Sequence, residues 1–332
     1  MNLRTLLTRY SKGELSIDEL QKRISVHSIE QVANNVAQLD VNREIRKEIP
    51  EVIFAKGKEY VDLLEITRAA VHRNGRVIVS KVQPKQLLDR LCRALKKVNL
   101  EIEVGKKSST ILVWNKSYFP PSSNSNSGAS SSRSGGGGAP RAPRRGKIGI
   151  LAAGTSDIGI AEEARLMAKS MGCETIESYD VGIAGIHRLF PALREMISEN
   201  VGALVVVAGM EGALASVVTS MVNIPVIGVP TSVGYGFGSD GVAALAAMLQ
   251  SCTPGLSVVN IDNGIGAGAT AALISNQLAK TMAKGRKEDE DEEEQLNEER
   301  KDARKNNKYR TTRRIRGTYY TDAQKHRNRT AK

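Results

Sequence analysis

Three features of this sequence have clear chemical potential: a histidine–arginine pair, a set of glycine-rich loops, and one cysteine outside any apolar run. Histidine exchanges protons near neutral pH and arginine binds phosphate or carboxylate, so His187 and Arg188 are candidates for proton transfer and anion binding. Cys252 lies in the loop sequence Ser-Cys-Thr-Pro-Gly, where a thiol with a lowered pKa would be a nucleophile. Cys92, on a predicted helix, and Cys173, before a predicted strand, are interpreted as packing thiols.

The other polar loops follow predicted strands. Gly154 lets the backbone approach a ligand, and Ser156 or Asp157 can cap the next helix, whose N-terminus is then a ready anion site. Glu211 stands between glycines at a helix start, and four glycines follow Thr231, which suggests a mobile cover over a ligand. The candidate substrate-binding residues are Gly154, Thr155, Ser156, Arg188, Glu211, Gly212, Thr231, Ser232, Asp262 and Asn263.

Strand-like and helical runs alternate through residues 147–283, which predicts a three-layer α/β domain. The strand-like runs are continuously apolar, as expected where helices cover both faces of a parallel sheet. Right-handed crossovers then give a flavodoxin-like, doubly wound sheet of five strands, with ligand bound beyond their carboxyl ends. The predicted strands are 147–153, 174–179, 203–208, 225–229 and 256–261, and the predicted helices are 159–171, 186–198, 212–222, 239–249 and 267–283.

The rest of the chain divides into a small domain, a linker and a tail. Residues 1–119 are predicted to form a small α/β domain, with helices within 2–40 and mixed strands and helices over 50–114. Residues 120–146 consist mainly of Pro, Ser, Asn, Gly and Arg and are predicted to be a disordered linker. Residues 284–332 have too little apolar content to offset chain entropy by burial, so we expect a charged, largely disordered tail.

The net charge of +12 is unevenly distributed. Residues 147–280 carry 6 basic and 11 acidic residues, a net of −5, whereas residues 1–120 have a net charge of +8. The overall basic charge is therefore not evidence that the predicted three-layer domain binds nucleic acid. Three cysteines without CxxC spacing argue against a zinc site or disulfide framework and indicate a reducing compartment, so we expect a cytoplasmic protein. No apolar run has the length needed to span a bilayer, and no membrane partner is expected.

The order of the loops resembles the PurE superfamily of aminoimidazole-ribonucleotide carboxylases and mutases. The segments that carry this resemblance are GTSD at 154–157, IHR at 186–188, AGMEGAL at 208–214 and PVIGVPTSVGYG at 225–236. AGMEGALASVV with PTSVGYG, and LQSCTPGLSVVNIDNGIGAG at 249–268, are similar to the LarB family, the pyridinium-3,5-biscarboxylic acid mononucleotide synthases. The second segment contains a cysteine that PurE enzymes do not need.

The N-terminal region also resembles LarB. Residues 39–44 with Pro-Glu-Val-Ile-Phe at 50–54 and Gly57-Lys58 are similar to the D-x-x-R…PEVVF…GK segment of that family, with Asn42 where the family often has histidine. The resemblance covers about residues 2–114 and 147–280, and the linker and tail have no counterpart in it.

The LarB resemblance implies carboxylation of the pyridinium ring of nicotinic acid adenine dinucleotide. Hydrolysis of the phosphoanhydride would release AMP and give pyridinium-3,5-biscarboxylic acid mononucleotide, in the nickel-pincer cofactor pathway. By resemblance, Cys252 is the nucleophile and His187 or Asp157 is the base that removes the ring proton. These roles require the sulfur to reach the crevice that the histidine–arginine pair shares with the first glycine loop.

The same resemblance implies the ligands and partners. Arg188 and the amides after Gly154 would bind phosphates, and Glu211 would orient the ligand or a magnesium ion that assists hydrolysis. Carbon dioxide or bicarbonate would be the co-substrate, with no tightly bound cofactor. A homo-oligomer, an octamer by resemblance, and a dinucleotide substrate are the expected partners. Nucleic acid is expected to bind only weakly, through the basic part of the tail.

Two other readings stay open. A phosphoribosylaminoimidazole carboxylase or mutase of de novo purine biosynthesis would share the fold and use His187, but it would leave Cys252 idle. A non-catalytic nucleotide- or RNA-binding module would use the basic termini and show steep salt dependence without product.

Overall fold

The structure is a computed structural model and describes residues 3–24, 29–32, 37–40, 43–116, 118, 146–285, 288 and 300. Residues 1–279 form one compact unit and residues 280–332 a second, of which residues 280–285 are helical. The predicted linker lies outside the described residues except for residue 146. The predicted tail lies outside them except for residues 284, 285, 288 and 300.

The C-terminal half of the first unit is built on a five-stranded parallel sheet. Its order is β11-β10-β9-β7-β8, so the chain enters at β7, adds β8 on one side, and then adds the remaining strands on the other. This is the flavodoxin-like doubly wound order, and it confirms the predicted fold class. The strands are β7 (Lys147–Ala152), β8 (Glu174–Tyr179), β9 (Ala203–Ala208), β10 (Val226–Pro230) and β11 (Leu256–Val258).

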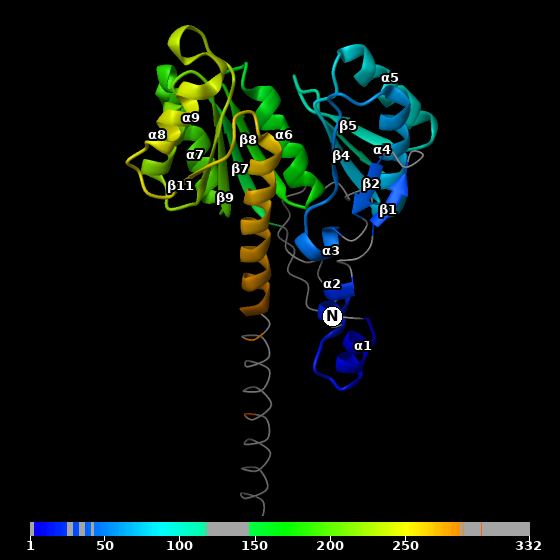
Figure 1. Cartoon of the computed structure of the whole chain (residues 1–332). Coiled ribbons are helices and arrows are strands. Elements are labelled where there is room, and N and C mark those ends of the chain that lie inside the picture. The colour runs from blue at the N-terminus through cyan, green and yellow to red at the C-terminus, as the bar shows by residue number, and fades with distance from the viewer. Residues whose placement is uncertain are drawn as a thin grey trace, which may run out of the picture. The chain divides into compact units, whose positions relative to one another are not determined.

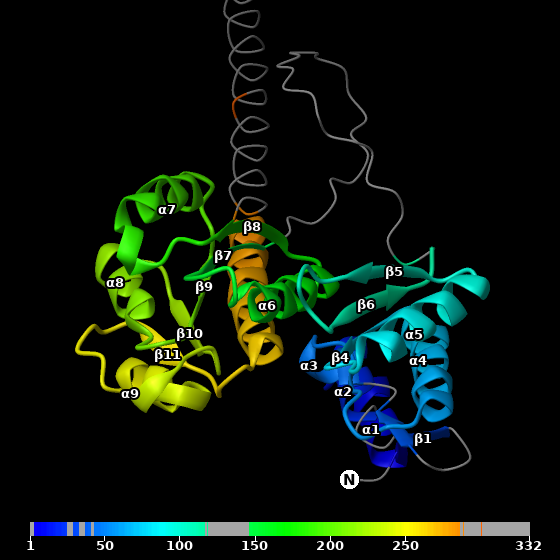
Figure 2. The same ribbon diagram turned by 90° about the horizontal axis from the view of Figure 1, so that it is seen from above.

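Helices cover both faces of this sheet, as Figures 1 and 2 show. Helix α6 and the helix that begins at residue 264 lie on one side, and α7, α8 and α9 lie on the other (Figure 2). The helices are α6 (Ile158–Ser170), α7 (Leu189–Ser198), α8 (Ala213–Met221), α9 (Val242–Leu249) and residues 264–285. Two short 3-10 segments, η2 (Ile183–Arg188) and η3 (Gly236–Gly241), precede α7 and α9.

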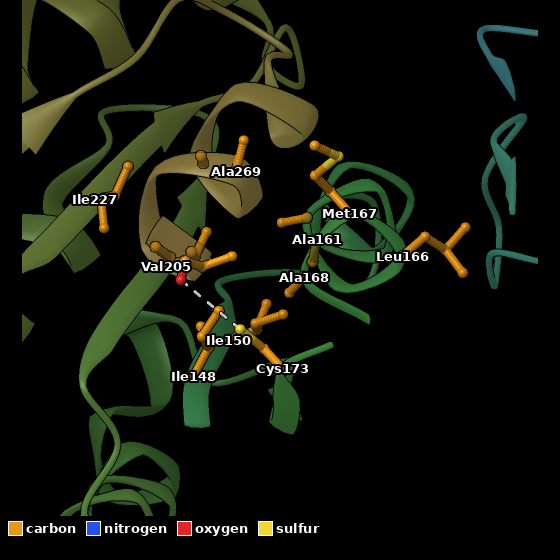
Figure 3. Close-up of a cluster of buried hydrophobic side chains, with 14 of the residues drawn as sticks. Ile148, Ile150, Ala161, Leu166, Met167, Ala168, Cys173, Val205, Ile227 and Ala269 are labelled. Atoms are coloured by element: carbon orange, nitrogen blue, oxygen red, sulfur yellow. Dashed lines mark hydrogen bonds between the residues drawn. The ribbon is translucent and has the colours of Figure 1, made fainter. Parts of the chain in front are cut away.

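Alternate residues of the central strands enter two separate cores, as strand geometry requires. On β7, Ile148 and Ile150 pack toward α6, whereas Leu151 packs into the cluster on the opposite face. Figure 3 shows Ile148 and Ile150 beside Ala168 on α6. The same view shows Leu166 pointing away from the sheet, on the other side of α6.

The N-terminal half of the unit contains a four-stranded mixed sheet of order β3-β4-β6-β5. Helices α4 and α5 cover one face, where their apolar residues form a core with alternate residues of β4 and β6. The elements are α1 (Leu3–Ser11), α2 (Ile17–Ile24), β1 (Ile29–Val32), β2 (Ala37–Asp40), α3 (Arg43–Lys47), β3 (Val52–Phe54), α4 (Tyr60–Asn74), β4 (Arg76–Ser80), α5 (Lys85–Lys97), β5 (Glu101–Val104) and β6 (Ile111–Trp114).

The prediction of helices throughout residues 2–40 is wrong over its second half. Strands β1 and β2 pair antiparallel, with Ile29 opposite Asp40 and Val32 opposite Ala37. The pairing gives the backbone its hydrogen bonds over two short segments and lets Leu39 enter the core beneath α4. Tertiary packing decided the conformation here, because the apolar residues of this stretch are too few to form a helical stripe.

The two sheets pack on opposite sides of α6. Ile78 of β4 and Leu112 of β6 belong to the same hydrophobic cluster as the residues of α6, and Val77 and Val113 face α4 and α5 instead. An ion network adds to this contact, since Arg165 on α6 pairs with Glu103 of β5 at 2.7 Å. The small domain is therefore joined to the parallel-sheet domain by a shared core. In the described part of the chain, no helix is both long and apolar enough to cross a membrane.

Candidate functional site

The doubly wound sheet has its topological switch point between β7 and β9, the two strands at which the chain changes direction of growth. Ligands of such sheets bind beyond the carboxyl ends of the strands at this point. The loops that follow the strands at this edge are 153–157, 180–188, 209–212, 231–241 and 259–263. The candidate substrate residues of the sequence all lie in these five loops.

Asp157 ties three of the loops together. Its Oδ2 accepts a hydrogen bond from the Gly154 amide at 2.8 Å, and its Oδ1 accepts one from the Thr231 hydroxyl at 2.7 Å. The amide of Gly209 donates a third. Asp157 and Thr231 are both buried. One carboxylate thus fixes the loops after β7, β9 and β10 at the switch point.

The expectation that Asp157 caps α6 is wrong. Asp157 occupies the N-cap position but has helical backbone angles and makes no side-chain cap hydrogen bond. Its carboxylate instead turns back to its own loop, so the Gly154 amide is used inside the protein and is not open to a ligand phosphate. Burial raises the pKa of Asp157, the three hydrogen bonds lower it, and nearby Asp262 raises it, with a net upward shift.

Glycine is required at one point of this junction by close packing. A Cβ at Gly209 would lie 2.2 Å from the Val233 carbonyl oxygen and 2.7 Å from the Thr231 hydroxyl. The Met210 amide also donates to Val233 O at 2.8 Å, so the loops after β9 and β10 are in direct contact. This part of the 231–241 loop is held in place at its first residues.

The loop after β11 joins the same edge. Asp262 Oδ1 accepts a hydrogen bond from the Ser232 amide at 2.9 Å, and the Asp262 amide donates to Pro230 O at 2.9 Å. Asn263 Oδ1 accepts from the Gly266 amide at 2.9 Å, so Asn263 caps the helix that starts at residue 264. Asp262 therefore belongs to the site cluster, whereas one oxygen of Asn263 is used structurally.

His187 and Arg188 lie on the loop after β8, the strand next to β7. His187 is exposed, and we find no hydrogen-bond partner for it in the part of the chain that the structure describes. Arg188 Nη1 pairs with Asp180 Oδ2 at 2.6 Å, with both side chains about half exposed. A Cβ at Gly185 would lie 2.7 Å from the Arg188 guanidinium, so the glycine leaves room for the arginine side chain in this position.

Glu211 and the residues after Gly154 are open to solvent. Glu211 lies exposed before α8, between Met210 and Gly212, whose φ values of 53° and 65° are both in the left-handed region. Among the described residues, no group of three or more His, Cys, Asp or Glu side chains is arranged to hold a metal ion. A magnesium ion at this position would have Glu211 as a carboxylate ligand and would take its remaining ligands from water and substrate phosphates. Thr155 and Ser156 are exposed in the loop after β7.

Cys252 is exposed, but one chain does not bring it to this edge. It lies before β11, and the Gly255 carbonyl of the same loop accepts from Val226, the first residue of β10. Asp262 contacts Pro230, the last residue of β10, so the two loops are separated by four strand steps, or about 13 Å. The cysteine loop thus sits at the amino ends of the strands and the Asp157 cluster at the carboxyl ends.

The other two thiols are packed. Cys173 is buried, and its Sγ donates to Asn276 Oδ1 at 3.3 Å and to the Ala272 carbonyl at 3.9 Å, the second contact being drawn in Figure 3. Burial raises the pKa of Cys173 to about 11 and also raises that of half-buried Cys92. Neither thiol is suited to act as a thiolate near neutral pH.

Sequence reasoning missed Glu163 and Lys81. Glu163 is only 2% exposed on α6, and its Oε1 pairs with Lys81 Nζ at 2.9 Å and accepts from the Thr110 hydroxyl at 3.1 Å. Burial raises the pKa of Glu163, and Asp262 adds to the rise. The sequence signal that could have indicated Glu163 is a pair of adjacent acidic residues, Glu162 and Glu163, within a helix that packs against other parts of the protein on both of its sides.

The fold and the site define an α/β protein with hydrogen-bonded polar loops at the switch point of a flavodoxin-like sheet, which is where ligands of such sheets bind. Residues 147–303 match the AIR carboxylase family, and residues 29–115 match the LarB/PurE-like N-terminal domain. The chain contains both domains and belongs to the LarB family. Membership of the AIR carboxylase superfamily supports an enzyme with a carboxylase-type activity.

Individual relatives agree with this assignment. An uncharacterized protein of Methanocaldococcus jannaschii is 44% identical over 279 residues, which cover 84% of this chain and 99% of that protein. The N5-carboxyaminoimidazole ribonucleotide mutase of the same organism is 34% identical over 133 residues, 40% of this chain and 77% of the mutase. The mutase of Thermotoga maritima is 29% identical over 149 residues, 43% of this chain and 82% of the mutase. The mutases match only part of this chain.

Proposed function

We propose that this chain carboxylates the pyridinium ring of nicotinic acid adenine dinucleotide and hydrolyses its phosphoanhydride to release AMP. The observation that carries the proposal is the pairing of a LarB/PurE-like N-terminal domain with an AIR carboxylase domain on one chain. The cysteine between α9 and β11 supports it, because pyridinium carboxylation needs a nucleophile and imidazole carboxylation does not.

The need for a thiolate follows from the electronics of the ring. A pyridinium ring is electron-poor, and its carbons do not attack carbon dioxide. Addition of the Cys252 thiolate forms a sulfur–carbon bond and converts the ring to a dihydropyridine, whose carbon beta to nitrogen is nucleophilic. That carbon bonds to carbon dioxide, a base takes the ring proton, and departure of the thiolate restores the aromatic ring. The net change replaces one ring hydrogen by carboxylate and releases one proton.

His187 is better placed than Asp157 to take that proton. A carboxylate has about four acceptor positions, and Asp157 already uses three of them inside the protein. His187 is exposed at the same edge of the sheet and has no partner among the described residues. We therefore assign proton transfer to His187 and positioning of the loops to Asp157. Arg188 would bind a phosphate from the same loop.

Because Cys252 and the crevice lie at opposite ends of the strands, we propose that the thiol acts on a ring bound by a second copy of the chain. Apolar side chains are exposed beside both parts: Leu249 is 67% exposed near Cys252, and Tyr235 is 79% exposed on the crevice loop. A homo-oligomer would cover such surfaces. The proposed site thus contains one chain's His187 and another chain's Cys252.

Mixing two inactive variants tests this arrangement. Cys252→Ala and His187→Ala should each lose carboxylation of nicotinic acid adenine dinucleotide. After unfolding and refolding together, mixed oligomers should regain part of the activity, because some sites then combine an intact thiol with an intact imidazole. Refolded wild-type protein gives the reference rate. Active wild type with no recovery in the mixture would reject a shared site.

The second candidate is a carboxylase or mutase acting on aminoimidazole ribonucleotides. The two mutase relatives favour it, and it uses the same sheet edge. It predicts turnover of N5-carboxyaminoimidazole ribonucleotide that is unaffected by Cys252→Ala. The pyridinium proposal predicts no turnover of that ribonucleotide and complete dependence on the cysteine.

A further inference from the structure

Two lysines of the N-terminal half contact two different loops of the crevice. Lys81, directly after β4, places its Nζ 3.3 Å from the carbonyl oxygen of Asp262 in the loop after β11. Lys107, in the turn between β5 and β6, places its Nζ 3.4 Å from the carbonyl oxygen of Thr155 in the loop after β7. The N-terminal domain therefore contributes cations to the edge at which we place the substrate.

Lys81 is held in position from two sides. Its ammonium pairs with Glu163 Oε1 at 2.9 Å, and the Thr110 hydroxyl donates to the same oxygen at 3.1 Å. Glu163 is almost completely buried, and its Oε2 has no hydrogen-bond partner among the described residues. The lysine side chain is 29% exposed, so its ammonium lies between a buried carboxylate and solvent.

The surroundings of Lys81 are acidic. Lys81 contacts both Glu163 and the backbone of Asp262. Asp157 lies close to Asp262, because the two carboxylates accept hydrogen bonds from the adjacent residues Thr231 and Ser232. The proposed substrate carries two phosphates and a ring carboxylate, so it would meet repulsion from these groups. Lys81 places a positive charge within this cluster.

We propose that Lys81 is a positioning residue of the active site, contributed by the N-terminal domain: it holds the Asp262 loop and offsets the carboxylate cluster so that an anionic nucleotide can bind. The inference rests on the proposed function for the identity of the nucleotide. It explains why the small domain shares a core with α6, since that contact brings the lysine to the crevice. It also gives LarB-type chains a part of the site that the PurE-type domain alone does not contain.

The test compares Lys81→Gln, Lys81→Arg and Glu163→Gln in the full chain, with steady-state kinetics on nicotinic acid adenine dinucleotide. Lys81→Gln should raise KM by about tenfold or more and change kcat by less than about threefold, since the charge acts mainly on binding. Lys81→Arg keeps the charge and should stay within about threefold of wild type. Lys106→Gln is the control, because it removes an exposed lysine one residue before Lys107.

The Glu163→Gln variant distinguishes an effect of the Lys81 charge on substrate binding from a general loss of folded structure. It removes one negative charge, and the glutamine oxygen can still accept a hydrogen bond from Lys81 and keep it in position. KM should therefore fall or stay unchanged, and the double variant Lys81→Gln with Glu163→Gln should return KM toward wild type. A merely structural pair would raise KM or lower stability in both single variants alike. Equal damage from Lys81→Gln and Glu163→Gln, or a KM in Lys81→Gln like that of Lys106→Gln, would overturn the proposal.

The proposed substrate can be wrong while the proposed role of Lys81 is right, and the experiment distinguishes the two cases. If wild type turns over only N5-carboxyaminoimidazole ribonucleotide, the proposed function is wrong, and the same variants are then measured on that anionic nucleotide. A loss of affinity in Lys81→Gln there would still support the role of Lys81. Melting temperatures of all variants identify any that do not fold, and in that case Lys81→Arg and the double variant decide the question.

Discussion

Replacing Asp157 by Asn tests whether one carboxylate holds the loops of the crevice together. The change keeps the shape of the side chain but removes its charge and replaces one oxygen by a donor. The Thr231 hydroxyl can rotate to accept from the new amide, and the remaining amide oxygen can still accept from Gly154. The backbone amide of Gly209, the third donor to this carboxylate, then competes with Gly154 for the one remaining oxygen, and one of the two amides is left without a full hydrogen bond.

The magnitude follows from that inventory. An unsatisfied buried donor costs about 1–3 kcal/mol, so Asp157→Asn should lower the free energy of unfolding by about 2 kcal/mol. Asp157→Ala leaves all three donors without this acceptor and should cost roughly twice as much. For a unit of this size, a loss of 2 kcal/mol lowers the melting temperature by about 4 °C or somewhat more.

The loss should also depend on pH in a defined direction. The pKa of folded Asp157 is raised above its ordinary value near 3.8, so the folded chain holds this proton more tightly than the unfolded chain. The stabilising effect of proton binding is fully present below the unfolded pKa and is lost as pH rises through the folded pKa. The stability difference between wild type and Asp157→Asn should therefore shrink as pH rises from about 3.8 through the folded pKa of Asp157.

Urea unfolding of both proteins at several pH values measures this difference. Asp89→Asn is the matched control, because Asp89 is exposed on α5 and lies outside the loops of the site. The activity of Asp157→Asn should fall mainly through KM, since the loops that bind substrate move. Unchanged stability and unchanged KM in Asp157→Asn, with the control also unchanged, would refute the positioning role.

Three further predictions concern the nucleophile, the loop junction and the core. Cys252→Ser should still bind nicotinic acid adenine dinucleotide, as measured by calorimetry, but should form no carboxylated product. Product formed at the wild-type rate would exclude a catalytic role for the Cys252 thiol. Gly209→Ala should lower kcat/KM by more than about tenfold, because the new methyl group would meet Val233 O at 2.2 Å; wild-type kinetics would show that the loops are not in tight contact. Ile150→Ala should lower the free energy of unfolding by about 2–5 kcal/mol, because Ile150 is fully buried (Figure 3). A loss below about 1 kcal/mol in urea unfolding would contradict that packing.

The parallel-sheet domain could be predicted closely from the sequence, because its strands are continuous apolar runs and its turns are marked by glycine. The strands at 174–179 and 203–208 have the predicted bounds. The last strand is shorter than predicted and ends at Val258, since residues 259–263 leave the sheet to build the site. The hairpin within 29–40 was not predictable from local pattern, because its pairing depends on a core contributed by α4.

The candidate site was predictable in its parts but not in its connections. The positions of Thr231 and Asp262 after strands predict that they line the site, yet no local pattern indicates that Thr231 donates to Asp157 or that Asp262 accepts from the Ser232 amide. The contact of Lys81 with Glu163 joins residues 82 positions apart and arises only when β4 packs on α6. The separation of Cys252 from the crevice likewise follows from strand direction, which sequence spacing does not reveal.

The most direct test of the proposed activity uses wild-type protein, nicotinic acid adenine dinucleotide and ¹³C-labelled bicarbonate. The products are separated by liquid chromatography, their masses are measured by mass spectrometry, and the position of the label is assigned by ¹³C NMR. We predict a mononucleotide with the label in a new carboxylate on the pyridinium ring, formed in equal amount with AMP and absent with Cys252→Ala. An unlabelled ring, or label that appears only when an aminoimidazole ribonucleotide is supplied, would contradict the account.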